Sequence, residues 1–370
     1  MHVIIETKAL AGASRAIKQI FAKGPVADKD NNNGCLVASK KDGSVTMESA
    51  NQGLYVKLRL PAEVEEAGKV VIDRAALSNL RLTDAKTTLK HKDASTDLGF
   101  RSGGLKGTLK ISQDFDEINS QRPSKIPEIT VKIESNMLRE GIKRVLFSSN
   151  DEDDPLLKLQ LSFQKNKMIL TTNDHYRAAM FSAFLEDEIE IAPIMIPAAF
   201  FFSVVSAIPA DTHIHLGIND SVIRIKGEGL DVCHPVLQDA SPVNMEKGIE
   251  AIEAEPPNVE FLTSVAEARE AILGVGSIIP SNTNIRMNLT VGGKKAVVKV
   301  ESSIGKADCW FPVSDVKVNG DEPVKLSSHY MQEFLGLMGD GEIQVRVWDK
   351  PIIMRSQKHG TTLVMPQLNQ

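Results

Sequence analysis

The chain has 370 residues and a net charge of −5, with 42% apolar and 25% charged residues. This composition excludes a disordered chain, and no run approaches the roughly 20 apolar residues of a membrane span. Three scattered cysteines form neither a disulfide framework nor a metal knuckle, and the first residues lack the pattern of a secretory signal, so we expect a cytoplasmic protein of two or three domains.

Six segments carry apolar residues three or four positions apart, the spacing that gives a helix one buried face. In chain order, these predicted helices span residues 10–21, 72–83, 137–147, 196–208, 261–273 and 326–338. The first, third and fifth contain apolar pairs that lie 126 residues apart, namely Ile20-Phe21, Leu146-Phe147 and Ile272-Leu273. This regular spacing predicts an internal repeat of three units.

Between the helices the apolar pattern changes to a period of two, which is typical of strands with one buried face. The strands predicted in this way span residues 158–163, 213–216, 222–226, 285–289 and 345–348. Asn219-Asp220 and Gly292-Gly293 suit hairpin turns, and prolines at 121–127 and 253–257 mark linkers. We therefore expect an α+β protein of three similar domains, each with two helices packed on antiparallel sheets, at residues 1–126, 127–255 and 256–370.

Charge is unevenly distributed along the chain. Residues 1–125 carry 20 Lys and Arg against 15 Asp and Glu, whereas the remaining residues carry 23 against 33. An acidic protein still binds nucleic acid when its positive charge gathers on one surface. The total charge therefore leaves a nucleic-acid partner open.

Motifs of catalytic chemistry are scarce. The sequence contains neither a G-x-x-x-x-G-K-[ST] phosphate loop nor a G-x-S-x-G nucleophile elbow. The carboxylates Asp151–Asp154 suggest a nuclease that binds metal ions, but metal sites recruit carboxylates from several elements rather than from one run. His213 and His215 share one side of a strand without a third ligand nearby. We favour a solvated loop and surface histidines.

Two further features have simple structural explanations. Cys233 and His234 are adjacent, and neighbours on a strand face opposite ways, so a buried cysteine is favoured over a nucleophile beside its base. The run Phe200–Phe202 has no basic residue within it, which favours core packing over stacking on bases. We expect no metal ion, no cofactor and no enzymatic activity, and therefore a binding or structural role.

Several motifs, taken in their order, resemble one family. They are Thr171–Met180 after a predicted strand, Val364-Met365-Pro366, Arg101-Ser102-Gly103 and Leu326–Tyr330. Together with the three-copy plan, they resemble the bacterial DNA sliding clamp, the beta subunit of the replicative polymerase, over essentially the whole chain. Asn173, Tyr176, Ala178 and Gln367 depart from the family pattern, which suggests a distant member, such as one encoded by a phage.

The resemblance implies a head-to-tail homodimer that closes as a ring around double-stranded DNA, without sequence preference. DNA polymerase and the clamp loader would bind it through short linear motifs. Two alternatives stay open at this point: a metal-dependent nuclease or nucleotide-acting enzyme that uses Asp151–Asp154 and the histidines, and a repeat-built assembly protein that does not bind DNA.

The resemblance also implies roles for particular residues. The groove for partner peptides would contain Leu156, Thr172, Tyr176, Arg177, Ala178, Pro242, Tyr330, Val364, Met365 and Pro366. The DNA-facing residues would be Arg15, Lys18, Lys23, Arg139, Lys143, Arg144 and Arg269. The dimer interface would involve Arg74, Leu109, Ile272 and Leu273.

Overall fold

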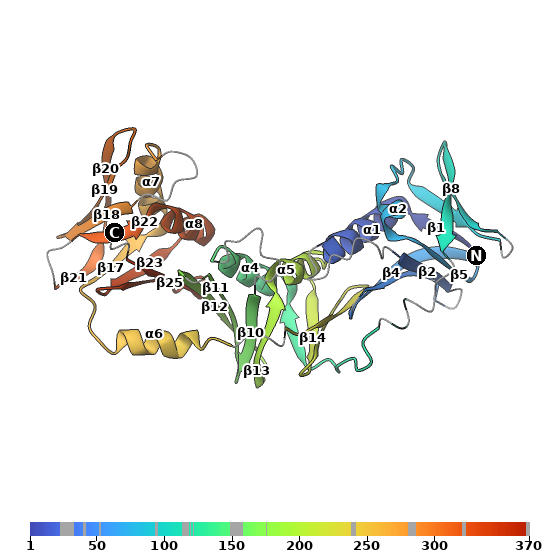
Figure 1. The fold of residues 1–370 in the computed structure, drawn as a ribbon, viewed down its shortest axis with the longest axis horizontal. Helices are drawn as coiled ribbons and strands as arrows, with labels where there is room; N and C mark the ends of the chain where they lie inside the picture. The colour runs from blue at the N-terminus through green and yellow to red at the C-terminus, as the bar shows by residue number, and fades with distance from the viewer. Residues whose placement is uncertain are drawn as a thin grey trace. The chain divides into compact units, whose positions relative to one another are not determined.

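The computed structural model divides into two units. Figure 1 labels the helices and strands. The residues that it describes are 1–22, 33–39, 42–51, 53–92, 95–112, 118, 120, 122–148, 158–174, 176–237, 242–279, 286–319 and 323–367. Unit 1 contains Met1–Arg139 and Ile196–Ala240, and unit 2 contains Glu140–Met195 and Ser241–Gln370. The expected division into three domains stays a prediction.

Helices in the described residues overlap all six that the apolar pattern predicts. They are α1 (Thr7–Ala22), α2 (Arg74–Asn79), α4 (Ser135–Leu146), α5 (Ala198–Ser206), α6 (Met245–Glu253), α7 (Val265–Gly276) and α8 (Ser328–Met338). Helix α6 was not predicted; Asn244 caps it by accepting a hydrogen bond from the Lys247 amide, and Met245 and Ile249, four residues apart, form its buried side. Within the described residues, no helix is both long and apolar enough to span a membrane.

Four predicted helices begin too early in the sequence: residues 196–197 belong to strand β13 (Ile191–Pro197) and residues 326–327 to strand β22 (Val324–Ser327). Residues 261–264 belong to strand β17 (Val259–Ser264), in which Phe261 and Thr263 are buried while Leu262 and Ser264 are less so. Residues 72 and 73 end strand β5 (Gly68–Asp73), which follows from the β-branched run that begins at Val70. In all four places a strand leads directly into the helix, so the helical pattern extended into the strand was a wrong prediction.

The repeat is present, but its predicted register is wrong. Strands β1 (His2–Glu6), β9 (Val131–Glu134) and β17 each lead into a helix, and these helices begin at Thr7, Ser135 and Val265, 128 and 130 residues apart. Counted from these starts, Ile272 of α7 corresponds to Ser14 of α1 and not to Ile20. The apolar pairs 126 residues apart are therefore not equivalent positions.

The described residues of unit 1 form an antiparallel sheet of twelve strands. In sheet order they are β1, β6 (Lys86–Lys90), β7 (Asp97–Ser102), β8 (Leu105–Ser112), β5, β2 (Asn33–Ser39), β3 (Ser44–Asn51), β4 (Leu54–Glu66), β16 (Leu230–Pro235), β15 (Val222–Gly227), β14 (His213–Ile218) and β9. The long strand β4 joins the two halves of the sheet, because it pairs with β16 near its start and with β1 near its end.

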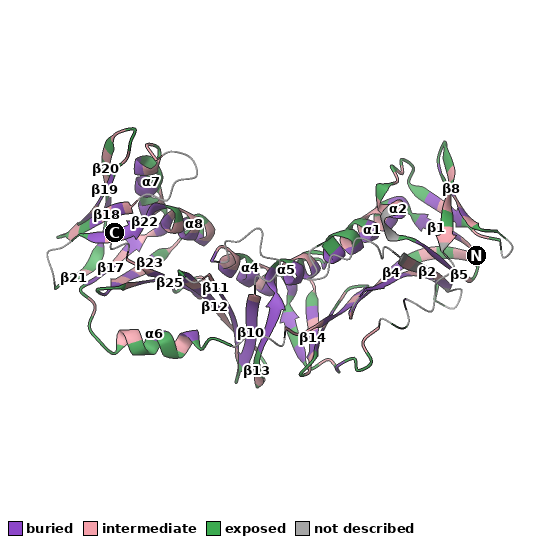
Figure 2. Cartoon of the chain, viewed as in Figure 1, coloured by how far each residue is buried: buried purple, intermediate pink, exposed green. Residues whose placement is uncertain are grey.

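In unit 2, the part of the chain that the structure describes forms a sheet of nine strands and a sheet of four. The larger has the order β13 (Ile191–Pro197), β10 (Lys158–Gln164), β11 (Lys167–Asp174), β12 (Arg177–Phe184), β25 (Thr361–Pro366), β24 (Pro351–Ser356), β23 (Glu342–Val347), β17, β21 (Ser314–Val318). The smaller has the order β20 (Lys306–Pro312), β19 (Lys295–Glu301), β18 (Arg286–Gly292), β22 (Val324–Ser327). Each of the five predicted strands overlaps an observed one. Phe261, Phe311 and Phe334 lie in the core that α7 and α8 share with these sheets. Both helices carry buried residues, drawn purple in Figure 2.

The two units contain equivalent strand pairs. In unit 1, β4 pairs with β16 so that Leu58 faces Leu230, and in unit 2, β12 pairs with β25 so that Phe181 faces Thr361. A glycine with positive φ precedes each second strand, Gly229 at 71° and Gly360 at 60°. Each glycine carbonyl accepts a hydrogen bond from the facing strand, at 2.7 Å from the amide of Arg59 and at 2.9 Å from that of Ser182. Position by position, β4–β16 therefore corresponds to β12–β25.

Candidate functional site

The residues considered for catalysis do not assemble an active site in the part of the chain that the structure describes. Within it, no group of three His, Cys, Asp or Glu side chains is placed to hold a metal ion. His215 of β14 pairs with Lys132 on one side and Lys226 on the other, and burial, followed by the charges of these lysines and of His213, lowers its pKa. The carboxylates Asp151–Asp154 lie outside the described residues.

The adjacent Cys233 and His234 are both buried, as expected for the cysteine. Burial raises the pKa of the Cys233 thiol to about 12 and lowers the pKa of His234 to about 4. The His234 ring packs on Phe200 with centroids 4.2 Å apart. The pair is therefore a neutral part of the unit 1 core, without an activated thiolate.

A pocket of about 420 Å³ lies in unit 2, where β12 begins and β25 ends. Its lining consists of Asn173, Tyr176, Arg177, Ala178, Lys350, Pro351, Val364, Met365 and Pro366. Six of these residues belong to the predicted groove. They come together because β25 pairs with β12, with Ala178 opposite Val364, and with β24, with Pro351 opposite Pro366. Tyr176 is 69% exposed at its edge.

Arg177 organises the inner side of this pocket. Its side chain is fully buried, Nε donates to Asp174 Oδ2 at 2.9 Å, and Nη1 donates to Glu333 Oε2. The guanidinium carbon lies 4.2 Å from the ring centroid of Tyr330 and 5.4 Å from that of Phe147. Burial, followed by the charge of Asp174, raises the pKa of Tyr330. Two carboxylates and two rings thus hold the guanidinium rigidly, with Tyr330 behind the pocket wall.

The end of β25 is fixed by Gln367, whose role the sequence did not reveal. Its amide N–H donates to Lys350 O, and its side-chain Nε2 donates to Trp348 O, both at 2.6 Å. Its Oε1 accepts a hydrogen bond from the Lys325 amide at 3.2 Å. Gln367 therefore holds Val364–Pro366 in place beside Trp348 and Lys350.

Four residues of the predicted groove, Tyr330 among them, are not among those that line the pocket. Thr172 is buried on the other side of β11, where its hydroxyl contacts Ser148 and the Val145 carbonyl. Neighbours on a strand face opposite ways, so Asn173 lines the pocket where Thr172 was expected. Pro242 lines a separate pocket of about 350 Å³ beside Val243, which is held by two hydrogen bonds to Gln160. Leu156 lies outside the described residues.

The basic residues predicted to face DNA divide into two groups. Arg15, Lys18 and Lys143 are exposed; Lys18 contacts Asn79 and Lys143 pairs with Glu140. Arg139 is instead directed at the carbonyls of Val205 and Ile208 at the end of α5, and Arg144 donates to the carbonyl of His359 at 3.1 Å.

Contacts of this kind commit a guanidinium to its own fold, so Arg139 and Arg144 are less accessible to phosphate than expected. Arg269 on α7 is half-buried, and Lys23 lies outside the described residues. Lys8, seven residues before Arg15 on α1, is likewise exposed.

The predicted interface residues also differ in exposure. Leu273 is 53% exposed, whereas Ile272 is 1% exposed and belongs to the core of unit 2. Ile272 therefore cannot contribute its side chain to a surface contact, which corrects the expectation for this residue. Leu109 is half-buried on β8, and the side chain of Arg74 lies outside the described part of the structure.

Comparison with known proteins identifies the fold. No family model matches the chain. The chain is similar to the beta sliding clamp of Rickettsia felis, with 25% identity over 211 residues, which cover 53% of this chain and 52% of that protein. This match spans about half the length of the curated relative.

Solved structures match the whole chain at low identity. A DNA polymerase sliding clamp from Bacillus subtilis has a TM-score of 0.82 at 16% identity and covers 100% of this chain and 99% of its own. The DNA polymerase III beta subunit of Thermotoga maritima has a TM-score of 0.80 at 16% identity, with the same coverage. That of Pseudomonas aeruginosa has a TM-score of 0.80 at 14% identity and covers 100% of both chains. The chain has the fold of these proteins, so the expected α+β clamp fold is confirmed.

Proposed function

We propose that the protein is a DNA sliding clamp, a processivity factor that closes as a homodimeric ring around duplex DNA and tethers the replicative polymerase. The observation that carries the proposal is the match to sliding clamps over 100% of the chain, at TM-scores of 0.80 to 0.82. The pocket at Asn173–Ala178 and Val364–Pro366 lies where the sequence resemblance implies the partner groove, and supports it independently. The role is cytoplasmic, non-enzymatic and independent of a cofactor.

The pocket suits a short linear motif of a polymerase or clamp loader. Val364, Pro366 and Ala178 offer apolar walls, and Tyr176 offers an exposed ring at the edge. Arg177 Nη2 is buried and, within the described residues, has no acceptor, so a peptide carbonyl that reaches it would satisfy a donor. Apolar side chains anchored beside one polar contact are typical of peptide recognition.

The homodimer would form through two strand edges. Among the described strands, β8 pairs with β5 only at Ile111 and Ser112, so Leu105–Lys110 has a neighbour on one side, and β20 ends the four-stranded sheet. Antiparallel pairing of β8 in one copy with β20 in the other would satisfy both edges. Because the two edges differ, the contact is head-to-tail, and two such contacts close a ring.

Exposed cations of α1 and α4 would contact the DNA. Arg15, Lys18 and Lys143 are the accessible members of the predicted set, and Lys8 joins them. Contacts to phosphate are independent of sequence and permit sliding. The ring itself, rather than tight binding, would keep the protein on DNA.

Primer extension on a primed circular template tests this function. A bacterial replicative polymerase with its clamp loader and ATP should make longer products per binding event when the protein is added. Light scattering should give twice the mass of one chain. A monomer that leaves product length unchanged would contradict the proposal.

A further inference from the structure

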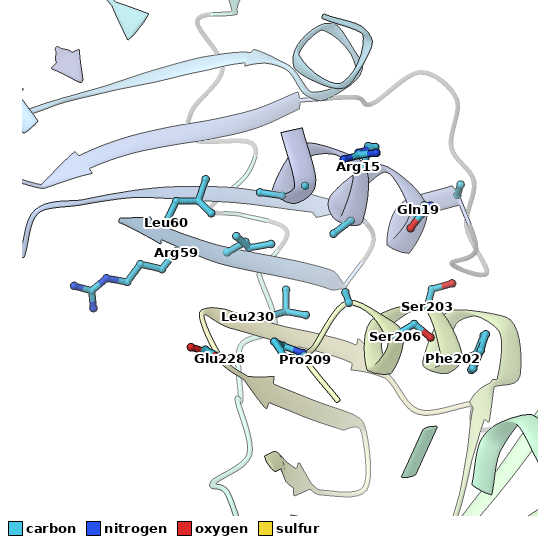
Figure 3. A pocket seen from close by; sticks show the side chains of 16 residues that line it. Arg15, Gln19, Arg59, Leu60, Phe202, Ser203, Ser206, Pro209, Glu228 and Leu230 are labelled. Atoms are coloured by element: carbon cyan, nitrogen blue, oxygen red, sulfur yellow. The ribbon is translucent and has the colours of Figure 1, made fainter. Parts of the chain in front are cut away.

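A further pocket lies in unit 1 and shares no lining residue with the pocket of unit 2. It has a volume of about 800 Å³ and opens between α1, α5 and the β4–β16 strand pair (Figure 3). Leu58, Leu60 and Leu230 form its apolar wall, and Gln19, Ser206 and Glu228 supply polar groups. Pockets of 300 to 1,000 Å³ with apolar walls and a few polar groups are typical of ligand sites.

The equivalent place in unit 2 contains an arginine side chain. Arg144 extends from α4 over the ring of Phe181 in β12, with the guanidinium carbon 6.0 Å from the ring centroid. Its Nη1 donates to the carbonyl of His359, the residue before Gly360, at 3.1 Å. This side chain covers the junction of helix, strand and turn in unit 2.

Unit 1 has the same junction without the arginine. Nine residues after the helix start, α1 has Ala16 where α4 has Arg144. By strand register, Leu58 takes the place of Phe181, and Glu228, the residue before Gly229, takes the place of His359. Ala16, Leu58 and Glu228 all line the pocket. The position that the Arg144 guanidinium occupies in unit 2 is therefore an open pocket in unit 1.

We propose that this pocket binds an arginine side chain of a partner protein. The guanidinium would lie against Leu58, as that of Arg144 lies against Phe181, and its N–H groups would donate to the turn at Glu228. Glu228 also carries a carboxylate that has no ion-pair partner among the described residues, and a planar guanidinium pairs well with a carboxylate. The volume exceeds that of one side chain, so residues next to the arginine enter as well.

Two arginines, Arg15 and Arg59, also line the pocket, and neither has an ion pair with Glu228 among the described residues. Arg59 points away from the pocket in Figure 3 and is bound to Asp42 and Ser44. Arg15 donates to Ala11 O of its own helix. An anion such as a DNA phosphate would face Glu228, which disfavours nucleic acid at this site. The inference does not depend on the clamp function, since it follows from two junctions of one chain.

The probe is a short peptide, acetyl-Gly-Arg-Gly-amide, titrated into the full-length protein with labelled leucine methyl groups. We expect methyl shifts at Leu58, Leu60 and Leu230, and none with the matched lysine peptide at equal concentration. Ala16→Arg places an arginine side chain in the pocket, as Arg144 does in unit 2, and should weaken binding of the peptide at least about tenfold. Glu228→Gln, an exposed change that leaves the fold intact, should also weaken it.

A reciprocal variant tests the equivalence of the junctions. Arg144→Ala should create a second peptide site in unit 2, reported by new methyl shifts at Leu170, which packs near Phe181 and Gly141. The proposal is overturned if the arginine peptide shifts none of the three leucines, if the lysine peptide binds equally, or if Ala16→Arg and Glu228→Gln leave affinity unchanged. If duplex DNA displaces the peptide and itself shifts the methyl signals of the same leucines, the pocket would be assigned to nucleic acid instead.

Discussion

The guanidinium of Arg177 lies 4.2 Å from the ring centroid of Tyr330, so a residue at the start of β12 packs on a residue at the start of α8. The same guanidinium pairs with Asp174 and Glu333. One side chain thus connects the turn before β12, helix α8 and the pocket. Its loss should affect folding and binding together.

Arg177→Ala should lower the free energy of unfolding by about 3 kcal/mol, because it leaves two half-buried carboxylates without their cation. It should also abolish binding of polymerase-derived peptides. Chemical denaturation and calorimetric titration measure the two effects. Arg59→Ala is the control, since the pair of Arg59 with Asp42 is exposed and should contribute less than about 1 kcal/mol.

Val364→Ala should weaken binding of polymerase-derived peptides about fivefold, because it removes two methyl groups from the pocket wall. The fold should stay intact. Deleting Val364–Gln370 is a poor test. Strand β25 pairs with both β12 and β24, so the deletion would remove an internal strand and unfold unit 2. Unchanged peptide affinity of Val364→Ala would show that the groove lies elsewhere.

Leu273→Asp should weaken the dimer without reducing stability, because Leu273 is 53% exposed. Ile272→Ala should instead lower the free energy of unfolding by about 2 to 4 kcal/mol and leave association unchanged, since its side chain lies in the core. Light scattering at micromolar concentration and thermal unfolding distinguish the two. A dimer unaffected by Leu273→Asp would place the interface away from this end of α7.

Replacing Arg15, Lys18 and Lys143 together by Ala should reduce the slope of the logarithm of the DNA-binding constant against log salt. The reduction should be at most the equivalent of about three phosphate contacts. Replacing Arg139 and Arg144 should leave the slope nearly unchanged and reduce stability, because these residues bind carbonyl groups of their own fold. Fluorescence anisotropy across a salt series gives both slopes. The reverse ranking would contradict the assignment of the DNA-facing residues.

His234 should make stability depend on pH. Its pKa is about 4 in the folded protein against an ordinary 6.5, so the unfolded chain binds the extra proton between these values. Above pH 6.5, His234 is neutral in both the folded and the unfolded protein and does not reduce stability. As pH decreases from 6.5 toward 4, the free energy of unfolding falls by about 3 kcal/mol in all. His234→Leu should remove this part of the dependence, measured by denaturation at pH 7 and pH 4.5. Identical pH profiles for the two proteins would mean that His234 is not buried in its neutral form.

The sequence predicts the helices and the strand periods well, because burial on one face leaves a clear apolar pattern. It fails where two patterns meet: residues 261–264 continue an apolar run across the change from β17 to α7. Ile272 was assigned to the interface by the resemblance, which does not show that its side chain is buried while that of Leu273 is exposed.

Prediction of the candidate site from the sequence has the same limit. Tyr176, Arg177, Ala178 and Val364–Pro366 could be predicted from their motifs, and the structure brings them together. Thr172 and Asn173 could not be distinguished, because a shift of one residue reverses the face of a strand. The pocket beside Ala16 leaves no sequence signal, since it depends on what is missing in one unit relative to the other.

The measurement that tests the clamp function most directly is retention on circular against linear DNA. The protein is loaded onto a nicked circle by a bacterial clamp loader with ATP and passed through a sizing column at high salt. It should remain with the circle and be lost once a restriction enzyme linearises the DNA, because the ring then slides off the ends. Equal retention on both forms, or loss from both, would contradict a closed ring around DNA.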